Sequence, residues 1–191
     1  MPIHILAIGG SLRQGSYNRL LIEQARRQAP QGAIIEIAEL SDVPLYDGDV
    51  EAQGLPDSVK RLAAQASRAD AFLIATPEYN YSVPGVLKNA IDWLSRAHTA
   101  PFSGKPAAII SASMSWLGGA RAQYHLRQIL VYLDARTLNK PELFISAAHE
   151  KFSASGELTD PAARQGLSNL LAALAGAARH TEATADDTQA A

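Results

Sequence analysis

Cysteine is absent from the 191 residues of this chain. Disulfide bonds, thiol catalysis, cysteine-bound zinc and cysteine-held iron–sulfur clusters are therefore excluded. The five histidines show no paired spacing of metal ligands, so the sequence predicts no metal site. If the protein carries out redox chemistry, a bound organic cofactor has to carry the electrons.

An excess of charge and long apolar runs are also lacking. The 17 basic and 19 acidic side chains give a formal net charge of −2. Nucleic-acid-binding domains usually carry a basic face, so we expect no nucleic acid partner. No apolar run approaches the roughly 20 residues that span a bilayer, and no signal peptide is visible. We therefore expect a cytoplasmic protein without a membrane partner.

What is present is an alternation of short apolar segments with helical patterns. The predicted strands are Ile3–Ile8, Ala33–Leu40, Ala71–Thr76, Ala107–Ser111 and Leu138–Ser146. The predicted helices cover residues 18–29, 57–68, 84–95, a segment that begins near 120, and 161–178, with a loop over 41–55. Strands joined by helical crossovers imply a parallel sheet covered on both faces.

Five such strands fit an α/β, flavodoxin-like, three-layer sandwich with strand order 2-1-3-4-5. We expect a single domain over residues 1–178 and a disordered tail over residues 179–191, where the sequence is small, polar and without pattern. Ligands of such folds bind beyond the carboxyl ends of the strands, at the point where the strand order reverses. Three unusual loops of this sequence follow predicted strands 1, 3 and 4.

The first loop, Gly10–Asn18, places two hydroxyls, a guanidinium, an amide and two glycines where a strand gives way to a helix. The open amides of a helix's first turn favour an anion there. The spacing of Gly10 and Gly15 suggests a nucleotide triphosphatase, but Ser16 and Tyr17 stand where that loop needs Lys and then Ser or Thr. The loop therefore suits the phosphate monoester of a bound cofactor. The alternative is an ordinary turn with Ser and Asn capping the helix.

The second loop, Pro77–Val83, carries two tyrosines, an amide and a carboxylate between Pro77 and Pro84, which stiffen its ends. A flat heteroaromatic ring needs apolar walls and a few fixed donors and acceptors at its edge. Tyr79 and Tyr81 can supply a wall or a hydroxyl, and the backbone can supply the edge contacts. An active-site lid or a decorated turn is the alternative.

The third loop, Ser113–Gly119, ends in two adjacent glycines, which allow a backbone to approach a ligand closely. Arg121 follows in the first turn of the next helix, where the helix dipole disfavours a cation unless an anion is near. A second phosphate-bearing ligand would account for Arg121. The alternative is an arginine that points into water.

The three loops belong to longer motifs. These are Gly-Ser-Leu-Arg-x-x-Ser-x-Asn at 10–18, Pro-Glu-Tyr-Asn-x-Ser-x-Pro-Gly-x-Leu-Lys-Asn-Ala-Ile-Asp-Trp-Leu-Ser-Arg at 77–96, and Gly-Gly-Ala-Arg-x-Gln-Tyr-His-Leu-Arg at 118–127. Over residues 3–145 the chain resembles the NADPH-dependent FMN reductases, most closely the bacterial branch called chromate or quinone reductases. The resemblance implies a flavodoxin-like fold, bound FMN, and NADPH or NADH as the hydride donor. It also implies two-electron, ping-pong reduction of quinones, chromate, azo compounds or flavin.

The same resemblance implies a set of site residues. Serines, the arginine and the asparagine of the first loop would hold the FMN phosphate, the second loop would border the ring mostly through its backbone, and Ser113 would approach the ring. The implied FMN contacts are Ser11, Leu12, Arg13, Gly15, Ser16, Tyr17, Asn18, Pro77, Glu78, Tyr79, Asn80, Tyr81 and Ser113. The implied contacts to the nicotinamide cofactor are Gly118, Gly119 and Arg121. No catalytic acid or base is expected, because the chemistry takes place at N5 of the flavin.

Some features leave alternatives open. The residues Met114-Ser115-Trp116 are bulkier than the family pattern and bear on access for the nicotinamide. A flavodoxin-type electron carrier without a nicotinamide site is the main alternative function, and a flavin-free scaffold domain is another. Trp93 lies off the main apolar stripe of its helix and fits a core, an interface or a lid. Tyr124, Gln128 and Tyr132 form an outward stripe. From it we predict a homodimer or homotetramer that uses this helix or the one at 84–96.

Overall fold

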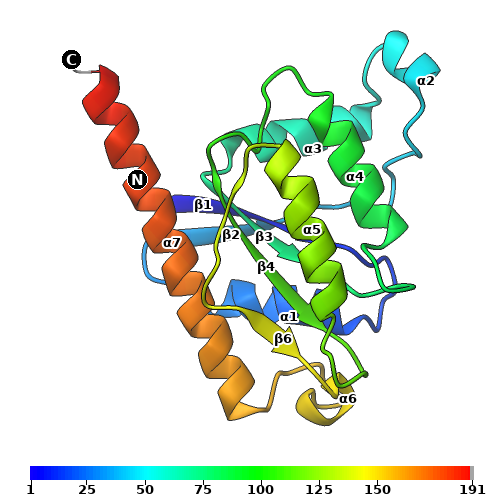
Figure 1. Cartoon of the computed structure of the whole chain (residues 1–191), viewed down its shortest axis with the longest axis vertical. Helices are drawn as coiled ribbons and strands as arrows, with labels where there is room; N and C mark the ends of the chain where they lie inside the picture. The colour runs from blue at the N-terminus through cyan, green and yellow to red at the C-terminus, as the bar shows by residue number, and fades with distance from the viewer. Residues whose placement is uncertain (190–191) are drawn as a thin grey trace.

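A parallel β-sheet forms the central layer of the computed structural model, which describes residues 1–189 (Figure 1). The strands are β1 (Ile3–Gly9), β2 (Ala33–Ile37), β3 (Ala71–Ala75), β4 (Pro106–Ala112), β5 (Arg136–Thr137) and β6 (Leu143–Ile145). They lie in the order β2-β1-β3-β4-β5, β6 also pairs with β4, and these pairs are all parallel. The predicted parallel α/β sheet with order 2-1-3-4-5 is confirmed.

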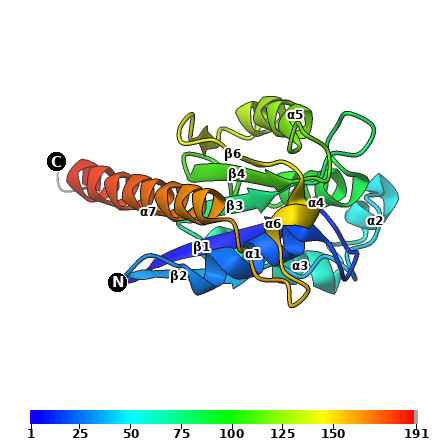
Figure 2. The ribbon, with the colours of Figure 1, turned by 90° about the horizontal axis from the view of Figure 1, so that it is seen from below.

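Helices cover both faces of this sheet (Figure 2). They are α1 (Tyr17–Arg27), α2 (Gly48–Ala52), α3 (Asp57–Arg68), α4 (Gly85–Ser95), α5 (Ala120–Tyr132), α6 (Ala148–Lys151) and α7 (Pro161–Gln189). Side chains alternate along β1: Ile5 and Ala7 pack with α1 and α7, whereas Leu6 and Ile8 pack with α3, α4 and α5. Both faces of the sheet are therefore buried, which explains why its strands are apolar almost throughout.

The single fifth strand predicted over Leu138–Ser146 is wrong. Two short strands replace it: β5 pairs with the start of β4, and β6 pairs with the end of β4. The chain between them includes Pro141, which has no N–H to donate to a strand ladder. The pairing therefore stops before this proline and resumes after it.

The segment between β2 and α3, predicted as a loop, contains the short helix α2. Asp47 caps this helix, because its carboxylate accepts a hydrogen bond from the backbone amide of Asp49 at 2.9 Å. The same segment is fixed to α4 by Trp93, which is fully buried and donates its indole N–H to the carbonyl of Pro44 at 2.8 Å. Trp93 is therefore a core residue and neither a lid nor an interface residue.

The last helix is longer than predicted. Leu167, Leu171 and Leu174 of α7 pack against the sheet. The helical backbone then continues past Ala178 to Gln189 and extends beyond the strands (Figures 1 and 2). The predicted helix end at Ala178 is therefore wrong. The single domain over residues 1–178 and the disordered tail over residues 179–191 stay predictions, and residues 190 and 191 lie outside the described residues. Glycine and proline, the two residues that most disfavour helix, are absent from residues 179–189.

Candidate functional site

The three loops that the sequence singles out meet at one edge of the sheet. They follow β1, β3 and β4, which are neighbours in the sheet, and so they lie at the carboxyl ends of adjacent parallel strands. The first and second loops touch: a Cβ added to Gly10 would lie 2.9 Å from a side-chain carbon of Pro84 and 3.0 Å from one of Pro77. Glycine is needed at position 10 because no larger residue leaves room for this contact.

The first loop offers hydrogen-bond donors without acceptors. Within residues 1–189, the backbone amides of Gly15, Tyr17 and Asn18 donate to no protein group. Ser16 is buried at the N-cap of α1, and its hydroxyl makes no capping hydrogen bond. The first turn of α1 also carries no acidic residue. Open amides, a hydroxyl and the positive end of a helix dipole together suit a phosphate group.

The side chain of Asn18 is partly engaged within the chain. Its amide nitrogen donates to the carbonyl of Ala112 at 2.9 Å, and its amide oxygen accepts from the N–H of Ala112 at 3.0 Å. Asn18 is buried and ties the start of α1 to the end of β4. The second N–H of this side-chain amide and the backbone amide of Asn18 have no acceptor within residues 1–189, and the predicted contact of Asn18 with phosphate stays a prediction.

Other side chains of the first loop shape it. The guanidinium of Arg13 lies over Gly15, where an added Cβ would be 3.0 Å from a guanidinium nitrogen. The ring of Tyr17 turns inward and packs against Phe152 with 5.5 Å between ring centroids. Tyr17 can therefore contribute to an anion site through its backbone amide only. The exposed side chain of Leu12 makes no polar contribution, whereas its carbonyl accepts from Arg19 at 3.4 Å.

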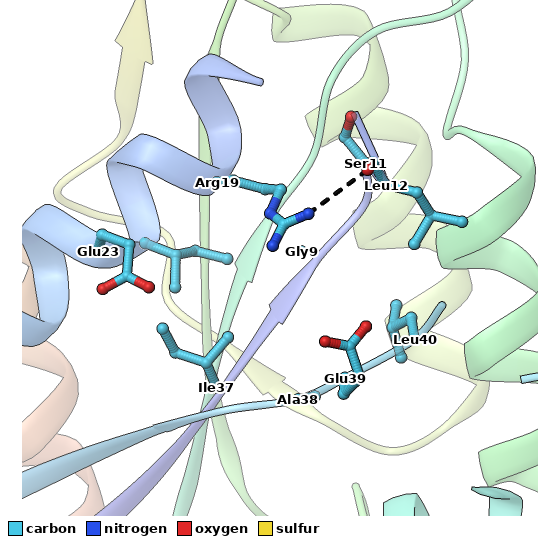
Figure 3. A pocket seen from close by; sticks show the side chains of 10 residues that line it. Gly9, Ser11, Leu12, Arg19, Glu23, Ile37, Ala38, Glu39 and Leu40 are labelled. Atoms are coloured by element: carbon cyan, nitrogen blue, oxygen red, sulfur yellow. Dashed lines mark hydrogen bonds between the residues drawn. The ribbon is translucent and has the colours of Figure 1, made fainter. Parts of the chain in front are cut away.

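A small pocket of about 70 Å³ lies beside the first loop, between α1 and the end of β2 (Figure 3). Arg19, Glu23 and Glu39 line it together with apolar side chains. Hydrogen bonds from the backbone and the hydroxyl of Ser41 hold the pKa of Glu39 below its ordinary value, so this carboxylate is charged at neutral pH. Two carboxylates beside one guanidinium disfavour a phosphate, and the open amides remain the better anion site.

The second loop turns sharply at its tip. Tyr79 and Ser82 exchange both backbone hydrogen bonds, at 3.1 and 3.0 Å. Between them Asn80 and Tyr81 both have left-handed backbone angles, with φ of 49° and 66°. Two such residues in succession are typical of a type I′ turn, which asparagine tolerates and tyrosine rarely adopts. Strained backbone of this kind gathers at functional sites, and here it presents the exposed rings of both tyrosines at the rim.

Glu78 of the second loop points to α5. One oxygen of its carboxylate lies 2.9 Å from a guanidinium nitrogen of Arg121, and the other accepts from the backbone amides of Arg121 and Ala122 at 3.0 and 3.4 Å. The anion that Arg121 requires is therefore Glu78 of the same chain. The prediction that a second phosphate-bearing ligand explains Arg121 is corrected accordingly.

The two glycines of the third loop face the interior. Gly118 and Gly119 have φ of 61° and 90°, and a Cβ on Gly119 would lie 2.8 Å from the Cβ of Ser111. A Cβ on Gly118 would lie 3.0 Å from the backbone of Phe144. Internal packing thus requires both glycines, and the predicted close approach of a nicotinamide does not explain them.

A buried polar network that the sequence analysis missed holds the third loop in place. The hydroxyl of Ser111 donates to the carbonyl of Gly118, and the amide nitrogen of Gln123 donates to Ser111 and to the carbonyl of Leu143 at 2.7 and 2.8 Å. Ser111 and Gln123 are fully buried. A serine at the end of an apolar strand and a glutamine on the inner face of a helix are the signals that would have found this network.

The remaining third-loop residues lie at the open edge. The hydroxyl of Ser113 accepts from the amide of Ser115 at 3.1 Å, and its carbonyl accepts from the amide of Ala148 at 3.0 Å. Met114 and Trp116 are 65% and 84% exposed, so these bulky side chains extend into solvent. No group of three or more metal-ligating side chains occurs in the described part of the chain. Nor does any helix there have the length and apolar character to cross a membrane.

A parallel sheet in this order, with open backbone amides after β1 and two more loops at the same edge, defines a flavodoxin-like α/β protein. The sequence model of the NADPH-dependent FMN reductases matches residues 3–150, and the chain belongs to this family. An NAD(P)H-dependent FMN reductase of Pseudomonas aeruginosa is 55% identical over 172 residues, which cover 90% of this chain and 93% of that protein.

Two further relatives agree. A quinone reductase of Escherichia coli K12 is 47% identical over 161 residues, covering 83% of this chain and 86% of that protein. Among solved structures, FerB of Paracoccus denitrificans, described as a flavoenzyme NAD(P)H:(acceptor) oxidoreductase, superposes with a TM-score of 0.85 at 33% identity. That match covers 94% of this chain and 98% of FerB.

Proposed function

We propose that this protein is an FMN-dependent NAD(P)H oxidoreductase that reduces quinones and related small-molecule acceptors by two electrons. The observation that carries the proposal is the meeting of three loops at one edge of the sheet, with open amide donors at the start of α1. Family membership and the names of the relatives, which are FMN, quinone and acceptor reductases, support it.

The first loop supplies the phosphate site in this proposal. The buried hydroxyls of Ser11 and Ser16, the exposed guanidinium of Arg13 and the open backbone amides all suit a doubly charged phosphate monoester. Leu12, Gly15, Tyr17 and Asn18 take part through their backbone. The loop has no lysine to contact a phosphate that is being transferred, which favours a phosphate that is held and not split.

The second and third loops border the ring. Backbone groups of Pro77, Glu78 and Asn80 are proposed to meet the polar edge of the flavin, and the rings of Tyr79 and Tyr81 to form a wall. Ser113 approaches from the third loop. Bound FMN supplies the hydride acceptor and the two electrons for the substrate, so the chain's own residues are required to bind, orient and exclude water.

The nicotinamide cofactor is proposed to enter from the side of the third loop. Gly118, Gly119 and Arg121 remain its proposed neighbours, although internal packing explains the glycines and Glu78 already pairs with Arg121. Met114 and Trp116 add an exposed apolar surface on which a planar ring can stack. No side chain is assigned as a catalytic acid or base.

A titration and a reduction experiment test the proposal. The purified protein is saturated with FMN, its affinity is measured by calorimetry, and NADPH or NADH is added without oxygen. We expect tight binding of FMN and rapid loss of flavin absorbance, followed by recovery when a quinone is added. Binding of FMN without bleaching by either nicotinamide would identify the electron carrier instead, and no uptake of FMN would refute the proposal as a whole.

We also propose that the protein is a homodimer or homotetramer that uses the outward face of α5. Val131 and Tyr132 are 76% and 87% exposed on this helix, and Tyr124 lies exposed further along it. Exposed aromatic and aliphatic side chains on one helix are typical of protein interfaces. The cytoplasmic location expected from the sequence stays a prediction.

A further inference from the structure

The second loop is held by α5 at three of its positions. Glu78 binds the first turn of α5, Tyr81 lies under the guanidinium of Arg121, and the hydroxyl of Ser82 lies 3.1 Å from Nδ1 of His125. Between these contacts, the backbones of Tyr79 and Ser82 exchange hydrogen bonds with each other. The position of the loop therefore depends on a helix that follows a different strand.

Glu78 makes the strongest of these contacts. Its two carboxylate oxygens accept one guanidinium N–H and two backbone N–H groups at the positive end of α5. The side chain of Glu78 is only 11% exposed, whereas that of Arg121 is 38% exposed. A charge-assisted pair with one buried partner is worth more than an exposed pair, because it is less screened by water.

Arg121, which is paired with Glu78, also contacts the tip of the second loop. Its guanidinium carbon lies 3.7 Å from the centre of the Tyr81 ring, within the range of a cation–π contact. Tyr81 is the residue with the unfavourable φ of 66°. A backbone conformation that tyrosine rarely adopts persists only where surrounding contacts impose it, and Arg121 provides such a contact.

We propose that Glu78 and Arg121 act together as a positioning pair that fixes the second loop, and with it the wall of the ring site, on α5. The expected kinetic effects of this pair rest on the proposed function, whereas its effect on the position of the loop does not. It gives Arg121 a role different from that of a ligand for the 2′-phosphate of NADPH, since the carboxylate of Glu78 already neutralises its charge. The effect on the reaction is exerted through the loop, and neither residue is a catalytic group.

A double-mutant cycle tests the pair. The variants are Glu78→Gln, Arg121→Gln and both together, and Lys88→Gln is the matched control, because Lys88 forms an exposed 2.8 Å ion pair with Asp92 on α4. We expect each single variant to lower kcat/KM about tenfold with NADH and NADPH alike, and the double variant to be no worse than the poorer single one. FMN affinity falls by a smaller factor than kcat/KM, because the phosphate site of the first loop is untouched.

Hydrogen exchange provides a readout that does not need the cofactor. In FMN-free protein, Glu78→Gln and Arg121→Gln should speed exchange of amides in residues 77–83 about tenfold, with no change in residues 10–18 and none in Lys88→Gln. Arg121→Lys, which keeps the charge but loses the flat stacking surface, should lie between wild type and Arg121→Gln.

Three outcomes would contradict the proposal that Glu78 and Arg121 position the second loop together. Additive losses in the cycle would show that the two residues act independently. An increase of KM for NADPH alone in Arg121→Gln would make Arg121 a phosphate ligand, and unchanged exchange in the second loop would remove the positioning role. Failure of the wild-type protein to bind FMN or to oxidise nicotinamide would refute the proposed function instead, and the exchange measurement would still decide on the pair.

Discussion

At the scale of single residues, the rim of the site is organised by buried polar side chains that bind backbone groups. Asn18 binds Ala112, Ser111 binds Gly118, and Gln123 binds Leu143. Each of these contacts joins a loop or a helix to the first residue or the last two residues of a strand. The backbone groups that remain without partners are then left at the start of α1, where the anion site is proposed.

Replacement of Asn18 by alanine tests this arrangement. It removes two buried hydrogen bonds and leaves the N–H and C=O of Ala112 without partners, so we expect the free energy of unfolding to fall by about 3 kcal/mol. Urea unfolding measures this change. The exposed Gln14 of the same loop gives the matched control, because Gln14→Ala should shift stability by less than about 0.5 kcal/mol. Equal effects of the two variants would contradict the structural role of Asn18.

Lys105 gives a prediction on pH. Its ammonium group donates to the carbonyls of Ala66 and Ser67 at the end of α3, and burial lowers its pKa below the ordinary 10.5, with the charge of Asp70 acting in the opposite direction. The folded protein therefore releases this proton at a lower pH than the unfolded chain does. Between the two pKa values the unfolded chain binds more protons, so the free energy of unfolding rises with pH across that window.

Comparison with Lys105→Met isolates this titration. We expect the stability of the wild-type protein relative to the variant to increase from neutral pH towards pH 10.5, because the variant lacks the titrating group. Unfolding midpoints of both proteins, measured over this range, provide the check. A stability difference that stays constant or decreases would contradict the direction of the shift.

At the scale of elements, the third loop is shaped by packing between β4, β6 and α5. Gly119 combines a φ of 90° with a site where a Cβ would meet Ser111 at 2.8 Å. Both the backbone angle and the clash oppose any side chain. The loop therefore keeps its position by steric exclusion as well as by the network around Ser111 and Gln123.

Gly119→Ala should lower the free energy of unfolding by about 3 kcal/mol and weaken FMN binding, because the third loop has to move. Gly176 is the matched control: it lies in α7, has no positive φ, and an added Cβ meets nothing within 4 Å. Gly176→Ala should stabilise the protein by about 0.5–1 kcal/mol, since alanine is the better helix former. Denaturant unfolding and calorimetry measure both effects, and a neutral Gly119→Ala would show that the loop adapts freely.

At the scale of the whole molecule, we propose that copies of the chain contact each other through the outward face of α5. Val131→Glu and Tyr132→Glu place charges on its most exposed apolar positions. We expect light scattering at micromolar concentration to show a dimer or tetramer for the wild-type protein and a smaller species for the double variant. A wild-type protein of monomeric mass would refute the assembly, and an unchanged mass of the double variant would move the interface away from α5.

The extent of sequence-based prediction differs between these scales. The strand order and the meeting of three loops follow from alternation of strands and helices, and both are confirmed. Residue roles that depend on partners far along the chain, such as those of Asn18, Arg121 and Gly119, could not be predicted, because each partner lies on another element.

The sequence by itself determined the parallel architecture and the edge at which a ligand site forms, because apolar periodicity and the position of polar loops are local properties of the chain. Only the tertiary structure decided which polar groups stay free at that edge. Asn18, Glu78 and Arg121 carry chemistry suited to a ligand, yet folding pairs them with groups of the same chain. The open amides at the start of α1 have no such partner within residues 1–189, because helix geometry leaves first-turn donors unpaired.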